Sequence, residues 1–162
     1  MIEKERIEEA KRNVKQYIDD GLLRIKDKNA PKFVDFFMKN AESSLQTASI
    51  LQEISDEQSL KSTLKVGSDF ESYLWVIVSS YYSMFYAATA LLASQGMRVT
   101  GQIVHRVTED ALIHFFVSNE KLAKLLEQYE EAKAAGLELI GREELMKRMQ
   151  KKANELIVAY ES

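Results

Sequence analysis

The sequence predicts an all-α protein: an up-and-down bundle of four to five helices, with an additional N-terminal helix. The 162 residues include only six Gly and one Pro, so the residues that interrupt helices are scarce. The long stretches between them carry apolar residues at helical spacing rather than in the alternation of a strand. No charged residue lies between Ser72 and Met97, which predicts one helix at the centre of the bundle. We expect an N-terminal helical arm over residues 1–30 and the bundle over residues 31–162.

The first two helices are delimited by Gly21 and Pro31. Residues up to Asp20 carry one apolar stripe among Glu, Lys and Arg, and Gly21 suits a left-handed helix end. Pro31 suits the first turn of the second helix, because backbone N–H groups in that turn have no partner within the helix and proline lacks only such a group. The apolar residues after Pro31 share one side of this helix, and they are Phe33, Phe37, Ala41, Leu45, Ala48 and Leu51.

The central helix is expected to begin at a capping box. Ser68 and Glu71 have the Ser-x-x-Glu spacing of that motif, and the helix should run to about Ser94 as the innermost one. Residues 55–67 are polar and predict a loop or a short turn of helix. A membrane span over residues 72–97 is the alternative, because the segment is long enough to cross a bilayer. Its many hydroxyl groups favour a buried helix in a bundle, where partners for them are available.

Two further helices complete the predicted bundle. The fourth begins near Gln102, and Ser118-Asn119-Glu120 is expected to cap a restart that continues to Tyr129. After breaks at Gly136 and Gly141, a last helix carries apolar residues at helical spacing, namely Leu145, Met149, Ala153, Leu156 and Tyr160.

Composition excludes several classes of function. The chain has 22 basic and 25 acidic residues, a net charge of −3, so no basic field covers the whole domain. It has no Cys, which excludes disulfides, thiolate nucleophiles and zinc–thiolate sites. Glycine-rich phosphate loops, dinucleotide fingerprints and His-Glu-x-x-His are missing. We therefore expect no cofactor and no metal. The charged N-terminal residues do not resemble a signal peptide and favour a cytoplasmic location.

The two histidines, His105 and His114, are the side chains expected to titrate near neutral pH. They lie nine residues apart, roughly on opposite sides of one helix, and so cannot share a metal. Each has an acid one turn away, Glu109 for His105 and Asp110 for His114, and His114 is expected to be a core-edge residue with a local partner. His105 lies in a stretch from Ser72 to Thr108 without any acid. The same stretch contains two arginines, Arg98 and Arg106, which with His105 near a helix N-terminus make a plausible anion site. The alternative is that the stretch is acid-free because it is buried core followed by a loop.

Aromatic residues cluster in the central helix and admit two interpretations. Tyr81 with Phe85, and Tyr82 with Tyr86, are four residues apart, so each pair shares one helix face. Such a stripe usually packs the core of a bundle, and stacking on nucleic-acid bases is the second interpretation.

A run of residues in the central helix resembles the HEPN domain (higher eukaryotes and prokaryotes nucleotide-binding), and in particular its small single-domain bacterial and archaeal branch. The run is Tyr81-Tyr82-Ser83-Met84-Phe85-Tyr86-Ala87-Ala88, followed by Ala90-Leu91-Leu92 and a Gly-containing loop that leads to His105. The resemblance covers roughly residues 31–160 and implies a dimeric bundle of four to five helices. Many members of the family are metal-independent ribonucleases of toxin–antitoxin systems, paired with a nucleotidyltransferase antitoxin.

The resemblance also implies site residues. The family motif is an Arg followed after four to six residues by a His, and Arg98 and His105 fit it with six residues between them. His105 would act as general acid or base, and Arg98 would stabilise charge on the scissile phosphate. Arg106, which belongs to the anion site inferred from the acid-free stretch, is expected to join them in binding a nucleotide. We expect an RNA- or nucleotide-binding domain that is a candidate ribonuclease. The alternative is a non-enzymatic helical interaction module that partners a nucleotidyltransferase-type protein.

Overall fold

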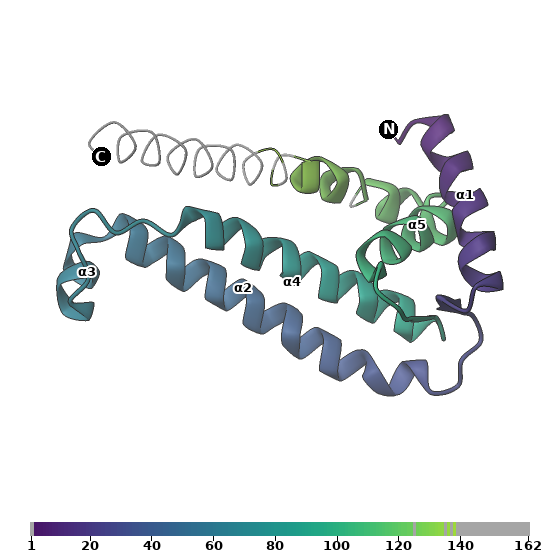
Figure 1. Cartoon of the computed structure of the whole chain (residues 1–162), viewed down its shortest axis with the longest axis horizontal. Helices are drawn as coiled ribbons and strands as arrows, with labels where there is room; N and C mark the ends of the chain where they lie inside the picture. Colours follow the sequence, from purple (N-terminus) through teal and green to yellow (C-terminus); the bar gives the residue numbers. More distant parts are fainter. Residues whose placement is uncertain (1, 125, 135, 137, 139–162) are drawn as a thin grey trace, which may run out of the picture.

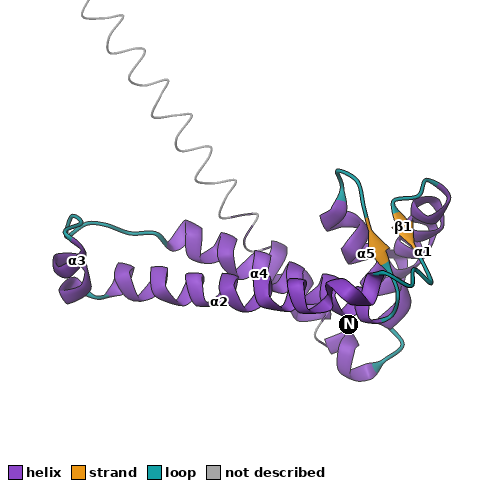
Figure 2. Ribbon diagram, turned by 90° about the horizontal axis from the view of Figure 1, so that it is seen from below, coloured by secondary structure: helices purple, strands orange, loops and turns teal. Residues whose placement is uncertain are grey.

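Two long helices, α2 (Val34–Asp56) and α4 (Tyr73–Ser94), lie side by side and antiparallel along the length of the molecule (Figures 1 and 2). The computed structural model describes residues 2–124, 126–134, 136 and 138. Small polar side chains join the pair: the Ser83 hydroxyl donates to the Ala41 carbonyl at 2.8 Å, and the Ser72 hydroxyl donates to the Leu51 carbonyl at 3.1 Å. Hydroxyl groups of the uncharged helix thus find partners within the bundle.

The remaining elements gather at the two ends of this pair. The short helix α3 (Gln58–Leu64) connects α2 to α4 at one end, while α1 (Lys4–Asp19) and α5 (Val104–Phe116) lie at the other (Figure 1). A 3-10 turn, η1 (Ala30–Phe33), leads directly into α2. Residues 120–134, apart from 125, are helical and run beside α4. The described part of the chain is therefore mostly helical, which confirms the predicted all-α class.

A sheet of two strands, each two residues long, joins the segment after α1 to the segment after α4. Strand β1 (Leu23–Arg24) pairs antiparallel with β2 (Arg98–Val99), with Leu23 opposite Val99 and Arg24 opposite Arg98. The Thr100 backbone N–H donates to the Leu22 carbonyl at 2.8 Å and extends this contact. The main core surrounds the sheet, where α1, α5 and the end of α4 meet. Its buried residues include Val14, Tyr17, Leu23, Leu92, Met97, Val107, Ala111 and Leu112.

Several sequence predictions of helix ends are confirmed. Helix α1 ends next to Gly21, which has the left-handed φ of +72° that favours glycine. Pro31 lies in the first turn of η1, just before α2, and residues 58–64 form the short helix α3. The Asn119 side chain accepts hydrogen bonds from the Lys121 and Leu122 backbone N–H groups, as expected of a residue that caps the restarted helix.

The predicted capping box is wrong. Helix α4 begins at Tyr73, after Ser72, rather than at Ser68, and no side chain caps it. The reason is tertiary: the Ser72 backbone N–H donates to the Ser55 hydroxyl at 2.9 Å. This contact gives the Ser72 backbone N–H, just before the first residue of α4, a partner on α2.

The expectation of an innermost α4 holds only for its C-terminal half. Its buried residues are Phe85, Thr89, Ala90, Leu92 and Ala93, all beyond the middle of the helix. Trp75 near the N-terminal end is 60% exposed, because α1 and α5 pack at the other end of the molecule. By length and composition alone, α4 is also the one helix in the described residues that could cross a membrane, which is weak evidence.

Gly136 lies within helical structure, so the prediction of a break there is wrong. A Cβ atom at this position would lie 3.1 Å from the Ile77 side chain of α4, so the missing side chain permits close approach of two helices. The last predicted helix, which follows Gly141, lies outside the described residues.

Candidate functional site

The loop that carries Arg98 is shaped by two left-handed glycines. Gly96 has φ +73° and ends α4, where the backbone N–H groups of Gly96 and Met97 donate to the carbonyls of Ala93 and Leu92. Gly101 has φ +93° and turns the chain from β2 toward α5. Because Arg98 lies in β2 between them, it has a defined position next to the end of α4.

His105 lies in the first turn of α5 and is held against α4 by aromatic side chains. Its Nδ1 is 3.0 Å from the Tyr81 hydroxyl, and its ring centroid is 4.1 Å from that of Phe85. The Tyr82 ring meets it edge-on at 5.6 Å. The imidazole is half-buried. No hydrogen bond of its second nitrogen, Nε2, is found in the described part of the chain.

The environment of His105 favours the neutral imidazole. Burial lowers the pKa of His105 below its ordinary value, and the positive charge of Lys133 lowers it further. At neutral pH the ring therefore has one N–H and one bare nitrogen. If Tyr81 donates to Nδ1, Nε2 carries the proton; if Nδ1–H donates to Tyr81, Nε2 is a base.

The local acids do not pair with the histidines as their spacing suggests. Glu109 receives hydrogen bonds from Arg6, at 3.1 Å, and from Lys133. Asp110, one turn before His114, is instead the acceptor for three groups of α1. His114 packs edge-on against the Phe115 ring at 4.6 Å, and burial lowers its pKa. Both acids bind donors from other helices, cations among them, which compete with histidines whose neutral form is favoured by burial.

Arg98 lies at the rim of a small cavity. Its guanidinium carbon is 5.3 Å from the centroid of the Phe33 ring, a cation–π distance, and its nearest acid is Asp27 at 4.0 Å. The side chain is 42% exposed. The cavity has a volume of about 170 Å³ and is also lined by Thr89 and Ala93 of α4. An exposed guanidinium with one long ion pair keeps most of its donors free for a phosphate or carboxylate.

Arg98 and His105 are placed along one stripe of α4 but do not share a partner. His105 contacts Tyr81 and Phe85, whereas the Arg98 cavity is lined by Thr89 and Ala93, one and two turns further along. One helical step of four residues is about 6 Å. A ligand larger than a single phosphate is therefore needed to reach both side chains.

Arg106, the third predicted site residue, faces another way. It is 63% exposed, and its guanidinium lies 3.6 Å from the Glu9 carboxylate of α1. Since its partner is on α1 while those of His105 are on α4, the two neighbours project from different sides of α5. Arg106 therefore does not join the stripe on α4.

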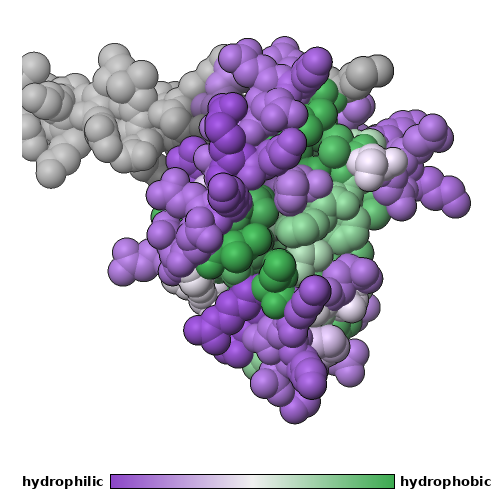
Figure 3. All heavy atoms as spheres, turned by 90° about the vertical axis from the view of Figure 1, so that its right-hand side faces the viewer, coloured by the Kyte–Doolittle hydropathy of each residue, from purple (hydrophilic) through white to green (hydrophobic). Residues whose placement is uncertain are grey.

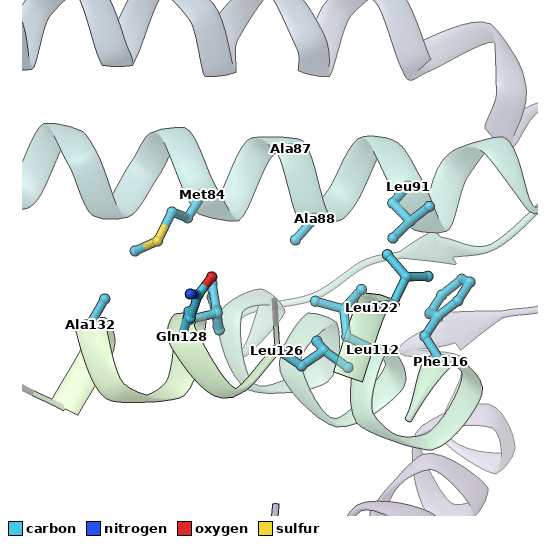
Figure 4. Close-up of a pocket in the computed structure, with 11 residues that line it drawn as sticks. Met84, Ala87, Ala88, Leu91, Leu112, Phe116, Leu122, Leu126, Gln128 and Ala132 are labelled. Carbon is cyan, nitrogen blue, oxygen red and sulfur yellow. The ribbon is translucent and has the colours of Figure 1, made fainter. Parts of the chain in front are cut away.

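A larger cavity of about 490 Å³ lies between α4, α5 and the 120–134 helix (Figure 4). Its walls are apolar side chains such as Met84, Leu91, Leu112 and Leu126, with Gln128 as a polar exception. A third hollow, of about 330 Å³, lies between Lys26 and Phe115. At the end of the molecule that faces the viewer in Figure 3, apolar side chains gather between hydrophilic ones.

Sequence reasoning missed Tyr81 as the partner of His105. The usable signal is the four-residue step from Tyr81 to Phe85, which places a hydroxyl and a ring on one face of α4. It also missed Arg6 and Lys133, which both donate hydrogen bonds to Glu109. Within the described residues, no group of three or more His, Asp or Glu side chains could hold a metal ion.

Comparisons with models of protein families, with curated proteins and with solved structures found no match to this chain.

Proposed function

We propose that this protein is a HEPN-like helical domain that binds RNA or a nucleotide along the stripe of α4 between Arg98 and His105. The observation that carries the proposal is the half-buried His105, held on the Tyr81 hydroxyl with its Nε2 free. Arg98 stands one to two turns away, with a guanidinium that is 42% exposed. This combination offers a guanidinium that donates hydrogen bonds to a phosphate, an imidazole that can transfer a proton, and flat aromatic surfaces on which a base can stack.

The groups match the chemistry of a nucleotide. Arg98 is suited to a phosphate oxygen because, among the described residues, the acid that pairs with it is Asp27 at the long distance of 4.0 Å, and Phe33 supports the guanidinium from one side. Tyr82 is 39% exposed beside His105 and offers a face on which a base can stack. Residues 72–108 contain no acid, so this segment adds no repulsive charge near the phosphate.

The proposal extends to metal-independent cleavage of RNA. In the tautomer whose Nδ1–H donates to Tyr81, the bare Nε2 of a neutral His105 would accept the proton of a ribose 2′-hydroxyl as that oxygen attacks the adjacent phosphorus. The bond from phosphorus to the 5′-oxygen of the next nucleotide would break, leaving a cyclic phosphate, and that oxygen would take up a proton. Arg98 would stabilise the added negative charge on the phosphate. We propose that the active form is a homodimer.

Labelled RNA incubated with the purified protein in chelator tests this function. The test variants are His105→Ala and Arg98→Ala. Their matched controls are His114→Ala, at the other histidine, and Arg24→Ala, at the residue opposite Arg98 in the two-stranded sheet. We expect cleavage in the parent and in both controls, with a loss of about 100-fold or more in His105→Ala.

Nucleotide binding, measured by calorimetry, separates a binding protein from an enzyme. Binding that weakens in Arg98→Ala, without cleavage in the parent, would retain the binding site and reject the ribonuclease. Equal binding in all variants would reject the site itself.

A second candidate function is favoured by exposed apolar side chains on α2 and α4. Phe36 and Trp75 are each 60% exposed, and Leu45 is 57% exposed. Such side chains are typical of surfaces that another protein covers. In this alternative the domain is a non-enzymatic module that binds a nucleotidyltransferase-type partner.

Co-purification with a nucleotidyltransferase encoded beside this gene tests the alternative. We expect Trp75→Ser and Phe36→Ser to weaken such a complex and His105→Ala to leave it unchanged. Retention of the complex in both Ser variants would contradict a role for these side chains.

A further inference from the structure

A cluster of ionised side chains joins three helices next to the candidate site. Arg6 of α1 donates to Asp110 at 2.7 Å and to Glu109 at 3.1 Å, both on α5. From the 120–134 helix, Lys133 binds Glu109, and the Glu130 carboxylate lies 4.0 Å from Arg6. Asp110 is 1% exposed and Glu109 is 6% exposed. Charges as deeply buried as these two are poorly screened by water and need opposite charges beside them, whereas the Arg6, Lys133 and Glu130 side chains are 24%, 25% and 31% exposed.

The charges of the cluster do not balance when every group is ionised. Its acids are Glu109, Asp110 and Glu130, while its bases are Arg6 and Lys133. One acid is in excess, and a single proton on one carboxyl would make the cluster neutral. The nearby pair of Glu9 and Arg106 carries opposite charges and leaves this surplus unchanged.

The hydrogen bonds indicate which carboxyl holds the proton. Asp110 accepts from Arg6, Asn13 and Tyr17, so it is ionised. Glu109 accepts from Arg6 and Lys133 and is ionised as well. Glu130 differs, since its Oε1 is buried and has no hydrogen-bond partner in the described residues. A protonated Glu130 can donate to the adjacent Glu109 carboxylate, which removes both the surplus charge and the repulsion.

The surroundings agree with this assignment. Burial, and after it the contact with Glu109, raises the pKa of Glu130 to about 7, while Arg6 and Lys133 oppose the rise. The cations and the contact with Glu130 lower the pKa of Glu109 in spite of its burial. The other titratable groups that face this pair are tyrosines with raised pKa values, Tyr129 from the same helix as Glu130 and Tyr81 from α4, which stay neutral.

We infer that Glu109 and Glu130 form a proton-operated clamp that holds the 120–134 helix against α5 and α1. The clamp is closed while the two carboxyls share one proton and is weakened when both are ionised. Because Lys133 and Tyr129 stand beside His105 and Tyr81, the clamp sets how firmly this helix covers that end of the candidate site. The inference does not depend on the proposed nucleotide binding.

The direction of the pH dependence follows from linkage. A raised pKa means that folded Glu130 holds its proton more tightly than the unfolded chain does. The stability from this proton is complete at acid pH, and it is lost as the pH rises through about 7. Glu109 has the opposite pH dependence, because its pKa is lowered in the folded protein. Its contribution to stability is present above the ordinary pKa of a Glu and is lost as the pH falls below that range. The clamp is therefore strongest at weakly acidic pH.

Carboxyl ¹³C NMR of the Glu-labelled full chain tests the protonation directly. We expect one Glu carboxyl to titrate near neutral pH, and its signal to be absent in Glu130→Gln. The matched control, Glu131→Gln, removes the exposed neighbour and should leave that signal in place. If every Glu carboxyl titrates below about pH 5.5, where ordinary carboxyls lie, the inference is overturned.

Amide hydrogen exchange tests whether the shared proton holds the 120–134 helix in place. After correction for intrinsic exchange, protection of residues 126–134 in the parent should fall about tenfold between pH 6 and pH 8.5, as linkage requires for this proton. Glu130→Gln mimics the protonated acid and should show no such fall, whereas Glu131→Gln should behave as the parent. An equal fall in parent and Glu130→Gln, or no fall in the parent, would exclude the clamp.

Discussion

The Tyr81 hydroxyl and the His105 Nδ1 lie 3.0 Å apart and join α4 to α5. The contact connects residues far apart in the sequence, and it fixes the imidazole while leaving Nε2 free. A histidine that is oriented at one nitrogen and open at the other is a recurrent arrangement in sites of proton transfer and ligand binding. The relationship makes Tyr81 a positioning residue for His105.

Replacing Tyr81 with Phe should release the His105 ring without removing the aromatic surface. The lost hydrogen bond is worth about 1 kcal/mol, so we expect about a fivefold weaker affinity for a nucleotide that binds His105. The ¹⁵N chemical shifts of the imidazole should show a changed balance of its two tautomers. Tyr82→Phe, which keeps the hydroxyl of Tyr81, is the control. Unchanged imidazole shifts in Tyr81→Phe would contradict the positioning role.

The pKa of His105 should lie below that of a histidine in a peptide, because burial and Lys133 both disfavour the imidazolium. Since the unfolded chain takes up this proton more readily, the stability linked to His105 is present above about pH 6.5 and is lost as the pH falls. NMR titration of the imidazole protons measures this pKa. Lys133→Met should raise it by removing the positive charge, and a pKa that stays the same in this variant would contradict the electrostatic effect.

Asp110 should be among the most sensitive residues to substitution. It accepts hydrogen bonds from Arg6 at 2.7 Å, from Asn13 at 2.9 Å and from Tyr17 at 3.0 Å. Asp110→Ala would leave a cation without its closest acid, and we expect a loss of about 3–5 kcal/mol in the free energy of unfolding. Urea denaturation measures this loss.

Two variants calibrate the Asp110 result. Asp110→Asn keeps one acceptor oxygen and should cost less than Asp110→Ala, while Asp19→Asn, at the exposed end of α1, should cost almost nothing. If Asp110→Ala were as stable as Asp19→Asn, the network would not stabilise the contact between α1 and α5.

Gly101 should be more sensitive to substitution than Gly21. Its φ of +93° disfavours L residues, and a Cβ atom would come within 2.6 Å of the Leu22 side chain. Gly21, at φ +72°, has open space where its Cβ would lie. We expect both Gly→Ala changes to lower Tm, with the larger fall for Gly101→Ala because it adds a steric clash to about 1–2 kcal/mol of backbone strain. Calorimetry of both variants decides the order, and an equal or smaller fall for Gly101→Ala would contradict the clash.

Local patterns account for most of the helices. Gly21 and Asn119 were recognisable as an end and a beginning because the backbone conformations they favour are properties of a few neighbouring residues. The prediction failed at Ser68, where the start of α4 depends on the Ser55 hydroxyl of another helix. It also failed at Gly136, whose missing side chain serves the contact with Ile77 rather than a helix end.

The sequence by itself determined the all-α class and the approximate positions of α1, α2, α4 and α5, since helical periodicity and helix ends are encoded within a few residues. It also singled out Arg98 and His105, whose joint role in binding stays a prediction. Only the tertiary structure decided that His105 pairs with Tyr81, and that Arg6 binds two acids about a hundred residues away. Those partners are chosen by packing, because a buried charge or ring nitrogen binds whichever group the fold brings within reach.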